Sequence, residues 1–168
     1  PLDEIYHAAQ RDFHRGSYAV ALPQLEKYIK ESKKTSYERE RLFAVIDQIG
    51  RIYLRVQRDP DAAIKFFTHI SKDVRLSDAE VMTIEEWQAA AKDWKKLGKI
   101  GTRQDADALY KRGKRFFDRG VARSRSPRDD EGNADFHISA SFLVPFIAHF
   151  DDDKRLPEAL LMMGTIRR

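Results

Sequence analysis

The stretch IDQIGRIYLRVQRDPDAAIKFF, residues 46–67, decides the fold class. Its first half carries apolar or small residues at the three- and four-residue spacing of one helix face, at Ile46, Ile49, Gly50 and Tyr53. Asp59 and Pro60 then mark a second helix, because Asp accepts hydrogen bonds from free N–H groups and Pro loses none in a first turn. The stretch therefore predicts two helices joined by a short turn.

Helical spacing of this kind recurs along the whole chain, and no segment alternates with the period of a strand. The sequence therefore predicts an all-α protein of about eight helices. We expect them at residues 2–15, 18–32, 37–56, 60–72, 78–97, 103–119, 135–150 and 157–167.

Local signals set several of these helix ends. Gly16, Gly98 and Gly120 follow periodic segments, where glycine can adopt the left-handed conformation that ends a helix. Ser77 followed by Glu80 is the pattern of a capping box, which predicts a helix start.

The segment VARSRSPRDDEGNA, residues 121–134, has no apolar period and contains both Pro and Gly. It predicts a long polar loop between two helices. Loops of that length are either functional or disordered, and the sequence leaves both possibilities open.

The composition limits the possible classes of protein. The 168 residues are enough for a single domain over 1–168, and no apolar run is long enough to cross a membrane. The chain contains no cysteine, which excludes disulfides and thiolate metal sites. Its net charge is +4, but 27 acidic residues are interspersed with 31 basic ones, unlike the concentrated basic patch of a nucleic-acid-binding protein.

The spacing of Ile46, Ile49, Gly50 and Tyr53 matches the pattern W-x2-L-G-x2-Y, and the Ala63 to Phe67 spacing matches A-x3-F. The chain therefore resembles the tetratricopeptide-repeat family, with a turn one residue longer than is usual there. A first hairpin, with Ala9, Gly16 and Ala21 at matching positions, also resembles the repeat, although Asp12 replaces its expected aromatic residue.

The small residues at the eighth position of each unit are Ala9, Gly50, Ala91 and Gly113. Small residues there let neighbouring helices approach closely. The resemblance implies a right-handed superhelix of antiparallel helical hairpins, whose first helices line a concave face. It also implies a non-catalytic protein–protein interaction module, an adaptor or scaffold.

In members of this family that bind peptides, contacts come from particular positions of the first helices. The matching positions here form an expected polar to basic groove, suited to a protein partner or to an acidic or extended peptide. They are Tyr6, Gln10, Asp47, Arg51, Arg55, Gln88, Lys92, Lys95, Lys96, Tyr110 and Lys114.

A different class of function stays open, a regulatory helical domain that binds a small molecule. It predicts an apolar cavity near Trp87, Trp94 and Tyr110. An enzyme is not expected, because the five histidines are scattered over separate helices and no spacing identifies a catalytic set, a metal site or a cofactor.

The segment 142–164 resembles the join between units in periplasmic repeat proteins of the bacterial envelope, which favours the periplasm or cell envelope over the cytoplasm. The final stretch PEALLMMGTIRR, residues 157–168, matches the start of a further unit. We therefore expect a piece of a longer protein, with possible self-association through an apolar face formed by Leu160, Leu161, Met162 and Met163. A terminal cap with a polar outer face is the alternative.

Overall fold

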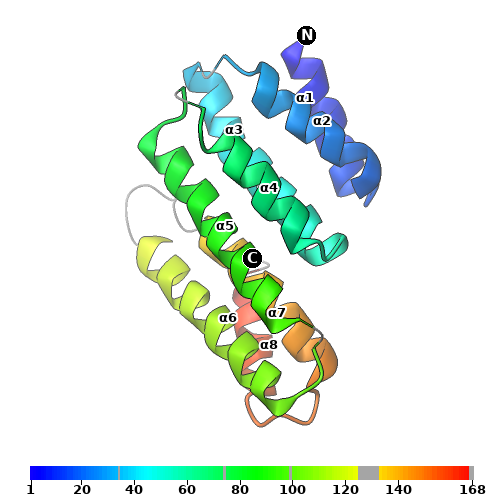
Figure 1. The fold of residues 1–168 in the computed structure, drawn as a ribbon, viewed down its shortest axis with the longest axis vertical. Coiled ribbons are helices and arrows are strands. Elements are labelled where there is room, and N and C mark those ends of the chain that lie inside the picture. Colours follow the sequence, from blue (N-terminus) through cyan, green and yellow to red (C-terminus); the bar gives the residue numbers. More distant parts are fainter. Residues whose placement is uncertain (34, 74, 99, 125–132, 167–168) are drawn as a thin grey trace. The chain divides into compact units, whose positions relative to one another are not determined.

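The computed structural model describes residues 1–33, 35–73, 75–98, 100–124 and 133–166, and the regular structure in these ranges is entirely helical. This confirms the all-α class and the prediction of about eight helices (Figure 1). The helices are α1 (Leu2–His14), α2 (Tyr18–Glu31), α3 (Ser36–Arg51), a π-helical segment η1 (Ile52–Val56), α4 (Pro60–Ile70), α5 (Asp78–Leu97), α6 (Arg103–Ser124), α7 (Asn133–His149) and α8 (Leu156–Ile166). Among the described residues, no helix combines the length and apolar character that crossing a membrane requires.

The contacts of the chain group it into two compact units, Pro1–Lys92 and Asp93–Arg168. The boundary lies within α5, so the first part of this helix packs in the first unit. Each unit is described by itself.

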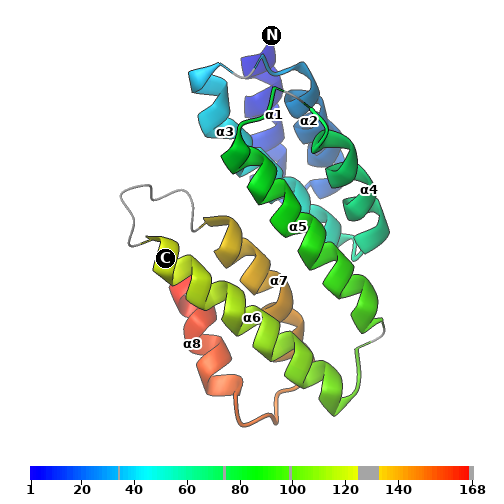
Figure 2. The ribbon, with the colours of Figure 1, turned by 60° about the vertical axis from the view of Figure 1, so that its left-hand side comes forward.

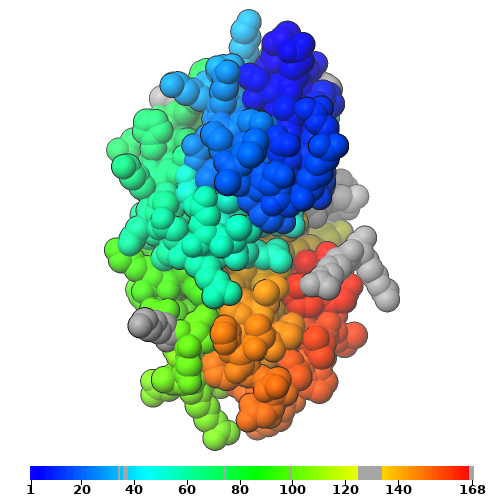
Figure 3. All heavy atoms as spheres, turned by 90° about the vertical axis from the view of Figure 1, so that its right-hand side faces the viewer, coloured from blue at the N-terminus to red at the C-terminus, as the bar shows by residue number. Residues whose placement is uncertain are grey.

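The helices α1 and α2 lie side by side in the first unit, in both ribbon views (Figures 1 and 2). Ala9 and Ala21 are fully buried, so their small side chains permit this approach. Gly16 has a φ of +79° at the turn between the two helices, as its predicted role requires. In the space-filling view the two helices form one continuous blue body (Figure 3).

The end of α3 passes into a π-helical segment, η1, in which Ile52, Tyr53 and Leu54 are all buried. The Gln57 N–H donates to the Ile52 carbonyl at 2.9 Å, a bond that spans five residues instead of four. A π-turn holds one more residue than an α-turn. This widened turn keeps three consecutive side chains in the core.

Gly50 of α3 lies directly against the side chain of a residue on α5. A Cβ atom added to Gly50 would lie 2.4 Å from the indole ring of Trp87, which is on α5. Trp87 is fully buried, stacks on Phe67 with ring centroids 6.4 Å apart, and donates from Nε1 to an Asp47 carboxylate oxygen at 2.9 Å. The absence of a side chain at Gly50 therefore leaves the space that the Trp87 ring occupies.

The second unit is built on the pair α6 and α7. Gly113 of α6 faces Leu143 of α7, and its carbonyl accepts a hydrogen bond from the Ser139 hydroxyl at 2.6 Å. The fully buried Asp135 carboxylate lies between Arg119 and Arg123 of α6, with N–O distances of 2.6 and 3.0 Å.

These contacts correct two predictions. Gly120 does not end a helix, because α6 continues to Ser124 and Gly120 packs against Phe136. The predicted loop 121–134 is helical at both ends, and only its residues 125–132 lie outside the described part. The bonds from Asp135 to arginines on α6 stabilise the last turn of α6, although that turn has no apolar period of its own.

The C-terminal helix α8 differs from its prediction in which residues are exposed. Met162 and Met163 are buried, whereas Leu160 and Leu161 are 51% and 73% exposed. The expected apolar face of four residues is therefore reduced to two leucines, next to the exposed Gly164.

The replacement Gly164→Ala should stabilise the protein by about 0.5–1 kcal/mol, because alanine loses less backbone entropy than glycine on forming a helix. Gly164 lies within α8, and an added Cβ would meet nothing within 4 Å. Chemical denaturation followed by circular dichroism measures the change. A loss of stability would show that this surface is covered by other atoms.

Candidate functional site

The predicted first-helix positions at the start of the chain are occupied by contacts within the first unit. Gln10 and Gln48 exchange two side-chain hydrogen bonds of 2.8 Å. The Arg41 guanidinium lies 4.2 Å from the ring centre of Tyr6. Asp47 is buried and accepts the Trp87 indole N–H. These predicted binding residues thus contact side chains of other helices in the first unit.

Arg51 is also partly enclosed. Its guanidinium lies 5.0 Å from the ring centre of Phe13, and burial lowers its pKa. Arg55 is half-buried, and Gln88 donates to the Thr68 hydroxyl at 3.0 Å. Lys92 alone among the predicted positions of this unit is exposed.

In the second unit the structure brings two predicted positions together. Tyr110 donates a hydrogen bond to Glu158, and the Lys114 ammonium lies 3.1 Å from the same carboxylate and 3.6 Å from that of Asp118. Burial and Glu158 raise the pKa of Tyr110 to about 12. Lys95 and Lys96, the remaining predicted positions, are exposed.

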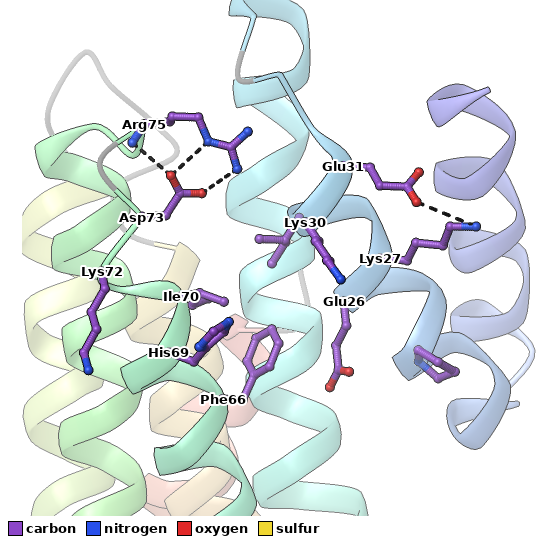
Figure 4. A pocket seen from close by; sticks show the side chains of 12 residues that line it. Glu26, Lys27, Lys30, Glu31, Phe66, His69, Ile70, Lys72, Asp73 and Arg75 are labelled. Atoms are coloured by element: carbon purple, nitrogen blue, oxygen red, sulfur yellow. Dashed lines mark hydrogen bonds and ion pairs between the residues drawn. The ribbon is translucent and has the colours of Figure 1, made fainter.

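The first unit also contains a groove that the sequence did not predict, between α2 and α4 (Figure 4). We call it the α2–α4 groove. Its volume of about 860 Å³ lies in the range of ligand-binding clefts. The lining residues are Pro23, Glu26, Lys27, Ile29, Lys30, Glu31, Phe66, His69, Ile70, Lys72, Asp73 and Arg75.

The floor of the α2–α4 groove is apolar. Ile29 and Ile70 are buried with only a small part of their surface exposed, and Phe66 is half-buried. The Phe66 ring rests on those of Tyr53 and Phe67, with centroids 6.0 and 5.6 Å apart. These aromatic contacts fix one side of the Phe66 ring against the core. The rest of the ring lines the groove.

The α2 side of the groove contains a short hydrogen bond from the Tyr53 hydroxyl to Glu26, at 2.5 Å. Burial and this carboxylate raise the pKa of Tyr53. The bond connects the π-helical segment to α2. It therefore positions Glu26, which Figure 4 shows beside Lys30 between the two helices.

A second hollow of about 680 Å³ lies in the second unit, beside the acidic turn before α8. There Arg155 binds Asp153 through two nitrogens, at 2.8 and 2.7 Å, and also bonds Asp107. These bonds keep the pKa of Asp153 well below its usual range. In the described ranges no three His, Cys, Asp or Glu residues are grouped so as to hold a metal ion.

The small-molecule hypothesis predicted a cavity near Trp87, Trp94 and Tyr110. Trp87 is packed on Gly50 and Phe67 with its N–H bonded, so protein atoms fill its immediate surroundings. In the second unit, Trp94 stacks on Phe142 with ring centroids 5.8 Å apart.

A repeated motif escaped the sequence reasoning. Asp73-x-Arg75-Leu76 and Asp153-x-Arg155-Leu156 each precede a helix, α5 or α8, and each Asp accepts bonds from the backbone N–H and Nε of its Arg at 2.8–3.0 Å. Matching the two segments directly, rather than against the repeat pattern, would have found it. Each unit thus contains one copy of this local structure.

Comparison of the chain with protein-family models, curated proteins and solved structures finds no match.

Proposed function

We propose that this protein is a non-catalytic protein–protein interaction module, an adaptor or scaffold built from tetratricopeptide-like hairpins in a right-handed superhelix. Two observations support the repeat architecture. One is that Gly50, at a small-residue position of the repeat pattern, is enclosed by α5 through the ring of Trp87. The other is the Asp-x-Arg-Leu motif that recurs before α5 and α8.

The α2–α4 groove carries the proposal of partner binding. It is a surface hollow between the second helices of two successive hairpins, with an apolar floor and a charged rim. Helical-repeat proteins bind partners through extended surfaces that successive hairpins build together. The α2–α4 groove is formed by second helices, so it differs from the first-helix face that the family resemblance implies. The predicted first-helix surface, which includes the exposed Lys92, is a second candidate site for a partner.

Two further parts of the proposal concern location and assembly. The join at residues 142–164 is the basis for proposing a periplasmic or envelope-associated bacterial protein. The exposed Leu160 and Leu161 support self-association through α8.

The groove is tested by selecting peptides from a displayed random library on the wild-type chain and measuring their binding to Phe66→Ser. We expect this substitution to weaken the selected peptides about tenfold or more, because it removes the exposed part of the apolar floor. Val20→Ser is the matched control, since Val20 lies on α2, is 53% exposed and does not line the groove. Thermal unfolding confirms that both variants are folded.

Equal binding to wild type and Phe66→Ser would contradict the assignment to this groove. In that case, measuring the binding of the same peptides to Lys92→Glu tests whether they contact the predicted first-helix surface. Selection of no peptide at all, over several rounds, would count against an interaction module of this kind.

A further inference from the structure

We propose that the α2–α4 groove selects an acidic segment of a protein partner, one that also carries a large apolar side chain. The inference rests on the proposed function and adds the chemistry of the ligand. It follows from which charged groups around the groove already pair with one another and which do not.

The acidic groups of the groove are already bonded within the protein. Glu26 accepts the Tyr53 hydroxyl at 2.5 Å. Glu31 lies 3.8 Å from the Lys27 ammonium, on the next turn of the same helix. Asp73 uses both carboxylate oxygens for Arg75, at 2.8 and 3.0 Å. A cationic ligand would therefore have to compete with an existing partner at each of these carboxylates.

Two lysines of the groove differ from these acids. Lys30 and Lys72 are exposed, and neither makes an ion pair with any residue that the structure describes. Lys27 and Arg75, in contrast, are paired with acids of the groove itself. The charged groups left for a ligand are thus cationic, one on α2 and one after the end of α4.

The position of Lys30 combines this charge with the apolar floor. Figure 4 shows its side chain extending from α2 into the space between the helices, where Phe66 and His69 project from α4. A bound chain that rests an apolar side chain on Phe66 would therefore place its neighbouring residues near the Lys30 ammonium. A carboxylate at such a neighbouring position forms a charge-assisted hydrogen bond.

The same arrangement disfavours a polyanion such as nucleic acid. Three carboxylates lie around the groove, so a continuous line of phosphates would also meet negative charges there. A protein segment can place single carboxylates at the lysines and apolar or neutral residues elsewhere. The ligand class is therefore an acidic, partly apolar segment, either helical or extended.

The test compares peptide pools selected from one displayed random library on two baits, the wild-type chain and the double variant Lys30→Glu with Lys72→Glu. We expect wild-type peptides to be enriched in Asp and Glu next to a large apolar residue, and peptides from the double variant to lose that enrichment. Wild-type peptides should bind the double variant about tenfold more weakly, and their affinity should fall as salt rises.

Lys65→Glu is the charge control for the single variant Lys30→Glu, which also reverses one charge and should weaken binding; Lys65 is exposed on α4 but does not line the groove. Its binding should stay within about twofold of wild type, since separated surface charges are screened by salt. An equal loss with Lys65→Glu would show a nonspecific effect of net charge and overturn the inference.

The inference and the proposed function can fail separately. Peptides that lose affinity for Phe66→Ser yet bind the double variant like wild type would refute the acidic preference and leave the groove as a partner site. Peptides indifferent to both changes would refute the groove itself.

Discussion

Replacing Trp87 with Ala should lower the free energy of unfolding by about 4 kcal/mol, the range found when large aromatic side chains are removed from a core. Trp87 is fully buried on α5 and stacks on Phe67 of α4. Its removal also leaves the buried Asp47 carboxylate without the indole donor at 2.9 Å. Denaturation followed by circular dichroism measures the effect without depending on tryptophan fluorescence.

A double-mutant cycle with Gly50 tests the cause of this stability. Gly50→Ala alone should cost about 3 kcal/mol, because its Cβ would lie 2.4 Å from a rigid, enclosed ring. In the Trp87→Ala background the same change should cost little, since the ring that it strikes is absent. The coupling between the two sites should therefore be favourable and exceed about 1 kcal/mol.

Gly113→Ala is the matched control for this cycle. An added Cβ there would lie 2.5 Å from Cδ2 and 2.6 Å from Cγ of Leu143, a fully buried aliphatic side chain that has more freedom to shift than an indole ring. We expect a cost of about 2 kcal/mol, smaller than at Gly50. Equal costs at both glycines, or additive effects in the cycle, would refute the seating of Trp87 on Gly50 as the critical contact.

Replacing Asp135 with Ala should destabilise the second unit by about 3 kcal/mol, because it removes the buried partner of two arginines. Asp135 is fully buried and receives bonds from Arg119 at 2.6 and 2.8 Å and from Arg123 at 3.0 Å. It also lies in the first turn of α7, where a negative charge is favourable. Thermal and chemical unfolding measure the loss.

Arg123→Ala separates these contributions. The Asp135 carboxylate keeps Arg119 in this variant, so we expect less than half of the effect of Asp135→Ala. Hydrogen exchange should show faster exchange in the last turn of α6, which these bonds stabilise. An unchanged last turn in Asp135→Ala would contradict our explanation of why α6 extends to Ser124.

Much of the helical layout follows from local signals in the sequence. The side chain of Asp59 accepts the Ala62 N–H, and Ser77 with Glu80 forms both bonds of a capping box, as predicted. The helices were placed to within a few residues except at α6. There the local signals, Gly120 and the polar segment after it, were overridden by contacts with Phe136 and Asp135 on α7.

The presence of the α2–α4 groove and the burial of several predicted binding residues depend on tertiary structure. Helical spacing shows which residues share a face, but not whether a neighbouring helix covers that face. Gln10 and Asp47 occupy plausible binding positions in the repeat pattern, and the structure places both between helices. Lys30 and Phe66 belong to different helices, and no sequence spacing relates them.

The sequence by itself determined the class, the helices and the small residue at Gly50, because spacing and caps act over a few residues of one chain segment. Only the tertiary structure decided that Trp87 fills the space above Gly50 and that Met162 and Met163 are buried while Leu161 is exposed. The physical reason is that burial and ion pairing join segments distant in sequence, and local pattern carries no information on their distances.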